Sequence, residues 1–396
     1  MSERVFSRNI LLLVLAQTVF VSGSALNVTL GGIVGSDLAP SPSLTTLPVS
    51  LTIVGTALGT IPATLLMQQI GRRWGFVLAA LLGVTGSLLA VTALRIESFL
   101  VFCAGSTTTG VALAFSQQFR FAAAESVPIN KAALAISLVL LGSVGGAIIG
   151  PELIASGGHF HADGPLQGAL IGAAALFVIG AILLFFFQDS ANQQAAKASD
   201  ADTVPLRSLL NEPLFLLAIA GGVVGQGIMA FIMTATPVSM HVIDGHSLEH
   251  TAQVIRAHVL AMYLPSFASG WLISRFGERN LMLVGVVIYF ATLAVGLAGH
   301  EVLHYSGSMI LLGVGWNFLF VGGTTLLVRT YHPSLRYRAQ TINEFAVFGT
   351  SALGSLLAGT LISSFGWNAV LLSTLPALGV MAVGLVWLRQ RALPTF

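Results

Sequence analysis

Two carboxylates lie inside long apolar stretches of the sequence, where a charge is costly. Glu152 comes directly after Gly150 and Pro151, and Glu344 comes directly after Asn343. The remaining acids, of 15 in all, fall in polar segments or at the ends of apolar stretches. A carboxylate inside a membrane is a common site for proton uptake. These two residues are therefore the candidates for proton coupling.

Glu344 is the stronger of the two candidates. It follows Arg338 by six residues, which is roughly 9 Å along a helix axis. A protonatable group at that depth would titrate as its surroundings alternate between wet and closed. The alternative is a salt bridge at the helix end with Arg338 or Arg336. Glu152 comes about 30 Å from the start of its helix, where its charge can stay wet.

The composition excludes an ordinary soluble domain. Of 396 residues, 55% are hydrophobic and 8% are charged, and the mean hydropathy is +0.89. Soluble proteins carry about 25% charged residues, so a helical protein that crosses the membrane several times fits better. The net charge of +2 comes from scattered basic residues, which indicates no nucleic-acid surface. The single cysteine, Cys103, excludes an intrachain disulfide.

The sequence carries no signature of a soluble enzyme. It contains neither a P-loop nor a G-x-S-x-G elbow, and no nucleophile–base or metal cluster lies among the apolar stretches. We therefore expect no enzymatic activity, no cofactor and no resident metal, with energy supplied by a gradient. His246 and His250, beside Glu249, could share a helix face as a metal site or pH sensor. Solvated loop residues are the simpler interpretation.

Twelve apolar stretches of about 20 residues or more predict twelve transmembrane helices. A polar segment at 189–208 divides them into an N-terminal six-helix bundle at 1–188 and a C-terminal six-helix bundle at 209–396. The expected spans are 9–34, 44–67, 75–95, 98–119, 132–155, 166–188, 212–238, 252–274, 280–299, 304–328, 338–362 and 367–388.

Lysine and arginine positions predict the orientation. With the N-terminus in the cytoplasm, 15 of the 17 basic residues fall in cytoplasmic segments. Only Arg95 and Arg256 lie at or near the outer side of the membrane. The positive-inside rule then places both termini and the 189–208 linker in the cytoplasm. We expect a multi-pass protein of the plasma (inner) membrane that works as a monomer.

The two halves of the chain repeat each other. Gly71 and Arg73 follow the second apolar stretch, and Gly277 and Arg279 follow the eighth at an offset of 206 residues. Because corresponding features recur at a nearly constant offset, the sequence predicts two related six-helix halves. Parallel repeats of this kind are a known transporter plan.

Four glycines recur at helical spacing in the fifth stretch. They are Gly142, Gly145, Gly146 and Gly150, and Pro151 follows the last of them. On a helix they form a stripe without side chains, which lets a second helix approach closely in lipid. Proline then weakens the helix by removing a backbone donor. Ordinary small-residue packing is the alternative interpretation.

Taken together, these features resemble the major facilitator superfamily (MFS). The glycine stripe with its final Gly-Pro resembles motif C, the pattern G-x-x-x-G-P in the fifth helix of the family's antiporters. The resemblance covers the whole chain. It implies an all-α membrane fold of twelve helices, built as two pseudo-symmetric halves of six, that works by alternating access. Motif C implies antiport.

The loops after the second and eighth helices resemble the family's motif A. In the family, an aspartate of this motif helps to lock the closed cytoplasmic face, but here Gln68 and Ser274 occupy the two acidic positions. The resemblance therefore implies a conformational role for these loops and a gate with less charge. The matching residues are Gly71, Arg72, Arg73, Gly277 and Arg279.

By the same resemblance, helices 1, 4, 7 and 10 line the substrate path. Their uncharged polar side chains predict a polar but weakly charged cavity, although each could instead bond to a neighbouring helix. The candidates are Gln17, Asn27, Gln117, Gln226, Trp316 and Asn317. The family's basic residue in helix 4 is missing, and we interpret Arg120 as a cytoplasmic anchor paired with Glu125.

The function that these observations favour is a proton-coupled secondary transporter that exports a small organic molecule by antiport. The first alternative is a proton-coupled importer of a nutrient such as a vitamin or siderophore. The second is a receptor or scaffold that binds a ligand without transporting it. The expected partners are a small-molecule substrate, protons and the lipid bilayer.

Overall fold

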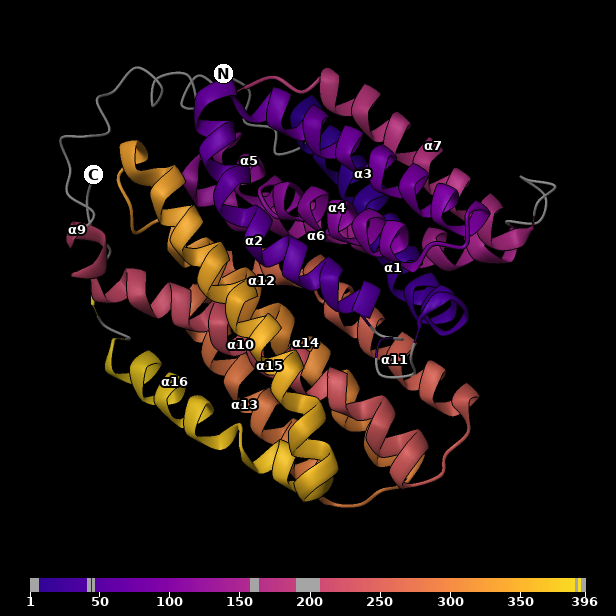
Figure 1. The fold of residues 1–396 in the computed structure, drawn as a ribbon. Coiled ribbons are helices and arrows are strands. Elements are labelled where there is room, and N and C mark those ends of the chain that lie inside the picture. The colour runs from indigo at the N-terminus through magenta and orange to yellow at the C-terminus, as the bar shows by residue number, and fades with distance from the viewer. Residues whose placement is uncertain are drawn as a thin grey trace. The chain divides into compact units, whose positions relative to one another are not determined.

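The computed structural model describes residues 7–40, 44, 47–156, 164–189, 207–388 and 391–392, and most of these are helical (Figure 1). They group into two compact units, Met1–Val127 with Leu138–Ser199 and Pro128–Ser137 with Asp200–Phe396. The predicted linker at 189–208 lies outside the described residues except at its ends. The predicted domain boundaries therefore stay a prediction.

The first unit is built from long apolar helices with short connections. Serine side chains begin two of them: Ser7 Oγ accepts from the Ile10 N–H, and Ser98 Oγ accepts from the Val101 N–H, which satisfies donors left free at a helix start. In chain order the helices are α1 (Arg8–Leu38), α2 (Leu47–Ile70), α3 (Arg72–Arg95), α4 (Phe99–Ser116), α5 (Phe119–Glu125), α6 (Ala132–Ser156) and α7 (Pro165–Phe185), of which α6 belongs to this unit from Leu138 onward.

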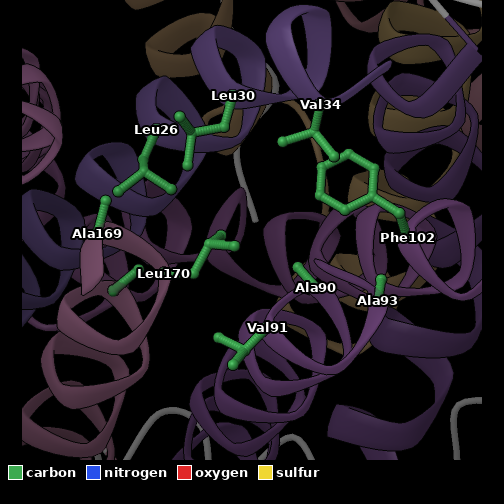
Figure 2. Packing of buried hydrophobic residues seen from close by; sticks show 10 residues of the cluster. Leu26, Leu30, Val34, Ala90, Val91, Ala93, Phe102, Ala169 and Leu170 are labelled. Atoms are coloured by element: carbon green, nitrogen blue, oxygen red, sulfur yellow. The ribbon is translucent and has the colours of Figure 1, made fainter. Parts of the chain in front are cut away.

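A buried aliphatic cluster joins four helices of the first unit (Figure 2). Leu26, Leu30 and Val34 recur every four residues and therefore lie on one side of α1. They cluster with Phe102 of α4 and with small side chains of α3 and α7 such as Ala90. This cluster fixes which side of α1 faces α3, α4 and α7.

The second unit repeats the plan with more irregular helices. It contains a π-helical turn, η4 (Val238–Ile243), directly after its first long helix, and such turns are often found at functional sites. The remaining helices are α9 (Arg207–Leu210), α10 (Pro213–Pro237), α11 (Leu248–Tyr263), α12 (Ser266–Phe276), α13 (Glu278–Leu297), α14 (Val302–Val328), α15 (Arg336–Leu372) and α16 (Leu375–Trp387).

Ten segments of the described chain are long and apolar enough to cross a membrane. The eighth expected span is missing from that count because it is interrupted at Pro265, between α11 and α12. The last two expected spans are counted as one segment, Arg336–Trp387, because α15 continues past the end of the eleventh span. Gly366 of α15, whose φ of 76° is not helical, marks the break between the two spans. Counting α11 with α12 as one span and dividing α15 at Gly366 gives the predicted twelve, and the all-α fold of six plus six is confirmed.

Candidate functional site

The glycine stripe of α6 packs directly against α1. A Cβ atom added at Gly146 would lie 2.6 Å from Val21 Cβ and 2.8 Å from the Thr18 carbonyl oxygen. One added at Gly150 would lie 2.9 Å from the Ser22 carbonyl oxygen. A backbone carbonyl cannot swing aside as a flexible side chain can, so the missing side chains are what permits this approach.

Polar side chains join the same two helices. Thr18 Oγ1 donates to the Gly142 carbonyl oxygen at 2.8 Å, and Gln17 Nε2 donates to Ser143 Oγ at 3.0 Å. The Gln17 amide thus takes part in a helix–helix contact, and its place on a substrate path stays a prediction. The side chains of Asn27 and Pro151 lie outside the described part of the chain.

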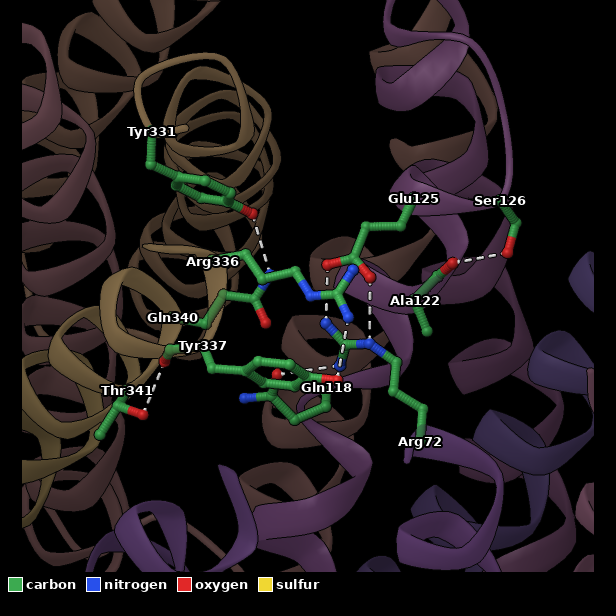
Figure 3. Close-up of polar contacts among 10 residues, drawn as sticks. All are labelled: Arg72, Gln118, Ala122, Glu125, Ser126, Tyr331, Arg336, Tyr337, Gln340 and Thr341. Carbon is green, nitrogen blue, oxygen red and sulfur yellow. Dashed lines mark hydrogen bonds and ion pairs between the residues drawn. The ribbon is translucent and has the colours of Figure 1, made fainter. Parts of the chain in front are cut away.

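Arg72 is completely buried at the start of α3 and binds a carboxylate (Figure 3). Its Nη2 and Nε donate to the two oxygens of Glu125 at 2.7 and 3.1 Å, and its Nη1 donates to Gln118 Oε1 at 3.3 Å. Two parallel bonds of this kind are a strong and specific geometry. Gly71, with φ of 90°, makes the tight turn that delivers Arg72 to this place.

The second unit contains the same arrangement with the charges exchanged. Gly277, with φ of 84°, precedes α13, and the next residue is Glu278. Arg329, at the end of α14, donates from Nη1 to Glu278 Oε2 at 3.3 Å. In each unit, therefore, a helix that starts after a glycine is tied to the end of a later helix, α5 in the first unit and α14 in the second. The cation comes first in one unit and the acid comes first in the other.

The next residue in each loop ties the same helix start to the last helix of its unit. The Arg73 backbone N–H donates to Asp189 Oδ1 at 3.2 Å, and its guanidinium lies 4.5 Å from the ring centroid of Phe185. Arg279 Nη1 donates to the carbonyl oxygens of Leu388 and of the residue at 391, each at 2.7 Å. In both units, therefore, the corresponding arginine contacts the end of the last helix or the residues just after it.

The predicted pair between Arg120 and Glu125 stays a prediction. The structure shows Arg120 Nη1 donating to Gln117 Oε1 at 3.1 Å, with the guanidinium 4.9 Å from the Phe121 ring centroid. The carboxylate of Glu125 is held by Arg72. Sequence reasoning missed this pair because the two residues are 53 positions apart.

Replacing Arg72 with alanine is expected to lower the free energy of unfolding by about 3–5 kcal/mol, because it removes the bidentate donor from a carboxylate that is 10% exposed. Arg72→Lys should recover only part of the loss, since lysine is a single point donor. Denaturant unfolding in detergent measures both. Arg275→Ala, at an exposed position, is the control, and equal unfolding midpoints for the two alanine variants would show that the pair contributes nothing.

Aromatic rings gather around Trp316 of α14 in the second unit. Trp316 stacks on Phe320 with the ring centroids 4.7 Å apart and 19° between the planes, and Tyr263 meets it edge-on at 5.7 Å. Trp316 Nε1 donates to Gln226 Oε1 of α10 at 2.6 Å. Because an indole nitrogen only donates, this bond fixes the orientation of the Gln226 amide and leaves Nε2 as its donating end.

Asn317, next along α14, is fully engaged in helix packing. Its Nδ2 donates to the Met262 carbonyl oxygen and to Ser266 Oγ, each at 2.7 Å, and its Oδ1 accepts from Ser269 Oγ at 2.5 Å. The Met262 carbonyl lies where Pro265 interrupts α11 and α12, so Asn317 stabilises that break. Its predicted contact with substrate stays a prediction, although the structure gives the side chain a packing role.

The two candidate carboxylates differ in burial. Glu344 is fully buried on α15, eight residues or about 12 Å after the helix start at Arg336. Asn343 Nδ2 donates to Glu344 Oε1 at 2.7 Å. Glu152 is exposed near the end of α6. The proton-coupling role of either residue stays a prediction.

A hydrogen-bonded network of histidines, which sequence reasoning missed, lies at the end of η4. Asp244 Oδ2 accepts from Tyr305 Oη at 2.6 Å and lies 2.9 Å from His300 Nδ1, and His246 Nε2 donates to the His300 carbonyl oxygen at 2.7 Å. His250 is exposed. Within the described residues, no group of three His, Cys, Asp or Glu side chains could hold a metal.

Twelve apolar helices form two related sets of six, and each set contains an ion pair directly after a glycine turn. This arrangement defines a multi-pass membrane protein with a duplicated plan. The sequence model described as Major Facilitator Superfamily matches residues 12–255 and 250–395. The chain belongs to this family of membrane transporters.

Relatives support the same assignment, and a solved structure shares the fold. The chain is 38% identical to the riboflavin transporter RfnT of Brucella anthropi over 96% of this chain and 95% of the relative. It is 30% identical to the MFS-type transporter YddS of Bacillus subtilis over 94% and 88%. The E. coli fucose:proton symporter FucP shares the fold at a TM-score of 0.74 and 15% identity, over 98% of this chain and 100% of that one.

Proposed function

We propose that the chain is a proton-coupled secondary transporter of riboflavin or a closely related flavin. The observation that carries the proposal is the 38% identity to a riboflavin transporter along nearly the whole of both chains. Identity at this level over the full length supports a shared substrate class more strongly than the fold does, because one fold serves many substrates.

The aromatic group around Trp316 suits a flavin. Its isoalloxazine ring is flat and apolar on its faces, with hydrogen-bonding groups along one edge. Trp316 and Phe320, which stack on each other and are each 4% exposed, supply aromatic rings of the kind that pack against a flat ligand, and the Gln226 Nε2 amino group is a donor for a ring carbonyl. We therefore assign substrate binding in the second unit to Trp316, Gln226 and Tyr263. Gln17 and Gln117 remain candidates in the first unit.

Proton coupling is assigned to Glu344. It is a fully buried carboxyl group inside a membrane-crossing helix. Ionisable side chains are energetically costly there and therefore occur mainly where they have a function. Asn343 can donate to the carboxylate and can accept from the protonated acid after its amide rotates. The exposed Glu152 is the second candidate.

Two directions of transport remain open to test. Export by proton antiport is favoured by the glycine stripe of α6, whose final Gly150-Pro151 resembles motif C. Uptake is favoured by the likeness to a transporter of riboflavin, since a vitamin is a nutrient. Counterflow in vesicles of known orientation distinguishes them: outward-biased exchange supports export and inward-biased exchange supports uptake.

Riboflavin is expected to raise the thermal unfolding midpoint of the purified protein, because a ligand that binds the folded state stabilises it in proportion to ln(1 + [L]/Kd). Trp316→Ala should weaken binding about tenfold, or ~1.4 kcal/mol, by removing the stacking surface. Trp271→Ala is the control, since that ring is 60% exposed on α12. No shift with riboflavin at millimolar concentration would exclude it as the substrate, and binding without flux in vesicles would favour a receptor.

A further inference from the structure

α11 and α14 pack against each other at close range near His258. A Cβ added at Gly313 would lie 2.8 Å from the His258 carbonyl oxygen and 2.9 Å from the Met262 backbone nitrogen. Met309, Gly313 and Asn317 recur every four residues and so form one stripe on α14. Two of the side chains with hydrogen-bonding capacity along this contact are His258 and Asn317.

His258 is completely buried, and its contacts determine its tautomer. Nδ1 lies 2.7 Å from the Met309 carbonyl oxygen. A carbonyl oxygen only accepts, so Nδ1 carries a proton, and in the neutral ring Nε2 is then a bare acceptor. Nε2 is buried, and no hydrogen-bond partner for it exists among the residues that the structure describes.

Asn317 and His258 differ in how many of their hydrogen-bonding groups have a partner within the bundle. Asn317 uses both of its amide donors and its carbonyl oxygen within the bundle. His258 uses only one of its two ring nitrogens. A buried acceptor without a donor costs roughly 1–3 kcal/mol, and packing alone would be served as well by a residue without that nitrogen.

Few titratable groups compete with His258 for a proton. The elements packed against α11 contribute His304 and Tyr305 of α14 and His241 of η4. On α11 itself, Glu249, His250 and Arg256 are exposed, and Tyr263, at the end of the helix, is half-buried. The structure shows no carboxylate hydrogen-bonded to His258 in the described chain, so a proton on Nε2 would not be held by a fixed counter-ion.

We propose that His258 is a proton-binding residue of the second unit, at which Nε2 takes a proton from water on one side of the membrane and returns it to water on the other. The Nδ1–H bond to Met309 holds the ring in place in both states. The proposal rests on the proton-coupled transport proposed above, and it adds a basic site to the acidic one at Glu344.

His258→Asn tests the proposal. The Asn Nδ2 group can replace Nδ1 as the donor to Met309, while the titratable nitrogen is lost. Protein reconstituted in vesicles is assayed for riboflavin exchange at equal pH and for accumulation under an imposed pH gradient. We expect exchange within twofold of wild type, and gradient-driven accumulation at least tenfold lower. His250→Asn, on the same helix but exposed, is the control and should match wild type.

A second measurement does not depend on the substrate. The ¹⁵N imidazole signal that is missing from the His258→Asn spectrum should move from the neutral Nδ1–H form towards imidazolium as the pH falls from 8 to 3. A signal that stays neutral, or accumulation by His258→Asn at the wild-type level, overturns the proposal. Wild type that exchanges no riboflavin contradicts the proposed function instead, and the titration then decides the role of His258. If His258→Asn does not fold, His258→Gln is measured in its place.

Discussion

Glu344→Gln is expected to abolish uphill transport driven by a pH gradient while leaving substrate exchange within about twofold of wild type. Glutamine has the shape of the protonated acid and keeps a carbonyl oxygen that can accept the bond from Asn343. The substitution therefore removes the proton without opening a cavity. Because exchange needs no net proton movement, only the coupled mode should fail.

The measurement uses reconstituted vesicles with and without an imposed pH gradient. Glu152→Gln is the matched control, because it makes the same chemical change at an exposed position on α6. If Glu344→Gln accumulates substrate at the wild-type rate, Glu344 is not the coupling residue. Failure of the Glu152 variant alone would transfer the assignment to that residue.

Gly146→Leu is expected to reduce transport to below about a tenth of wild type while the protein still reaches the membrane. Even the first atom of the new side chain would meet the Thr18 carbonyl oxygen and Val21 Cβ at less than 3 Å. Relief requires α1 to move away from α6. Overpacking of this kind costs ~1–3 kcal/mol, and a backbone contact is the hardest to relax.

A glycine with open surroundings provides the control. At Gly359 of α15 an added Cβ would meet nothing within 4 Å, so Gly359→Leu should transport at near the wild-type rate. Gly146→Ala should fall between the two, because it adds only the atom that clashes. Normal flux through Gly146→Leu would mean that close contact between α1 and α6 is not needed for transport.

The sequence predicted the fold well because its signals are local. A membrane-crossing helix must satisfy its backbone within about 20 residues, so length and hydropathy reveal it. The structure departs from twelve uninterrupted spans at two places. The eighth span is interrupted at Pro265, and α15 continues through Gly366 from the eleventh span into the twelfth, but neither changes the number of spans. The glycine stripe was equally visible, since its helical spacing is itself the signal.

The polar contacts were harder to predict because their partners are distant in sequence. Arg72 and Glu125 are 53 residues apart, and Asp244 and His300 are 56 apart. Asn317 carried the same sequence signal as a cavity residue, yet three hydrogen bonds engage it in the bundle. Composition and spacing reveal that a polar side chain lies in the membrane, but not which neighbour it meets.

The exchanged charges of the two glycine-turn ion pairs bear on how a duplicated chain avoids assembling incorrectly. The halves are similar enough that the start of α3 could dock against the end of α14, and the start of α13 against the end of α5. The first mistake would bring Arg72 against Arg329, and the second would bring Glu278 against Glu125. Each is a like-charge contact in a poorly solvated place, which costs several kcal/mol. The opposite order of the charges thus distinguishes the two halves where their shared fold does not. It favours packing of α3 with α5 and of α13 with α14 over the two mixed pairings.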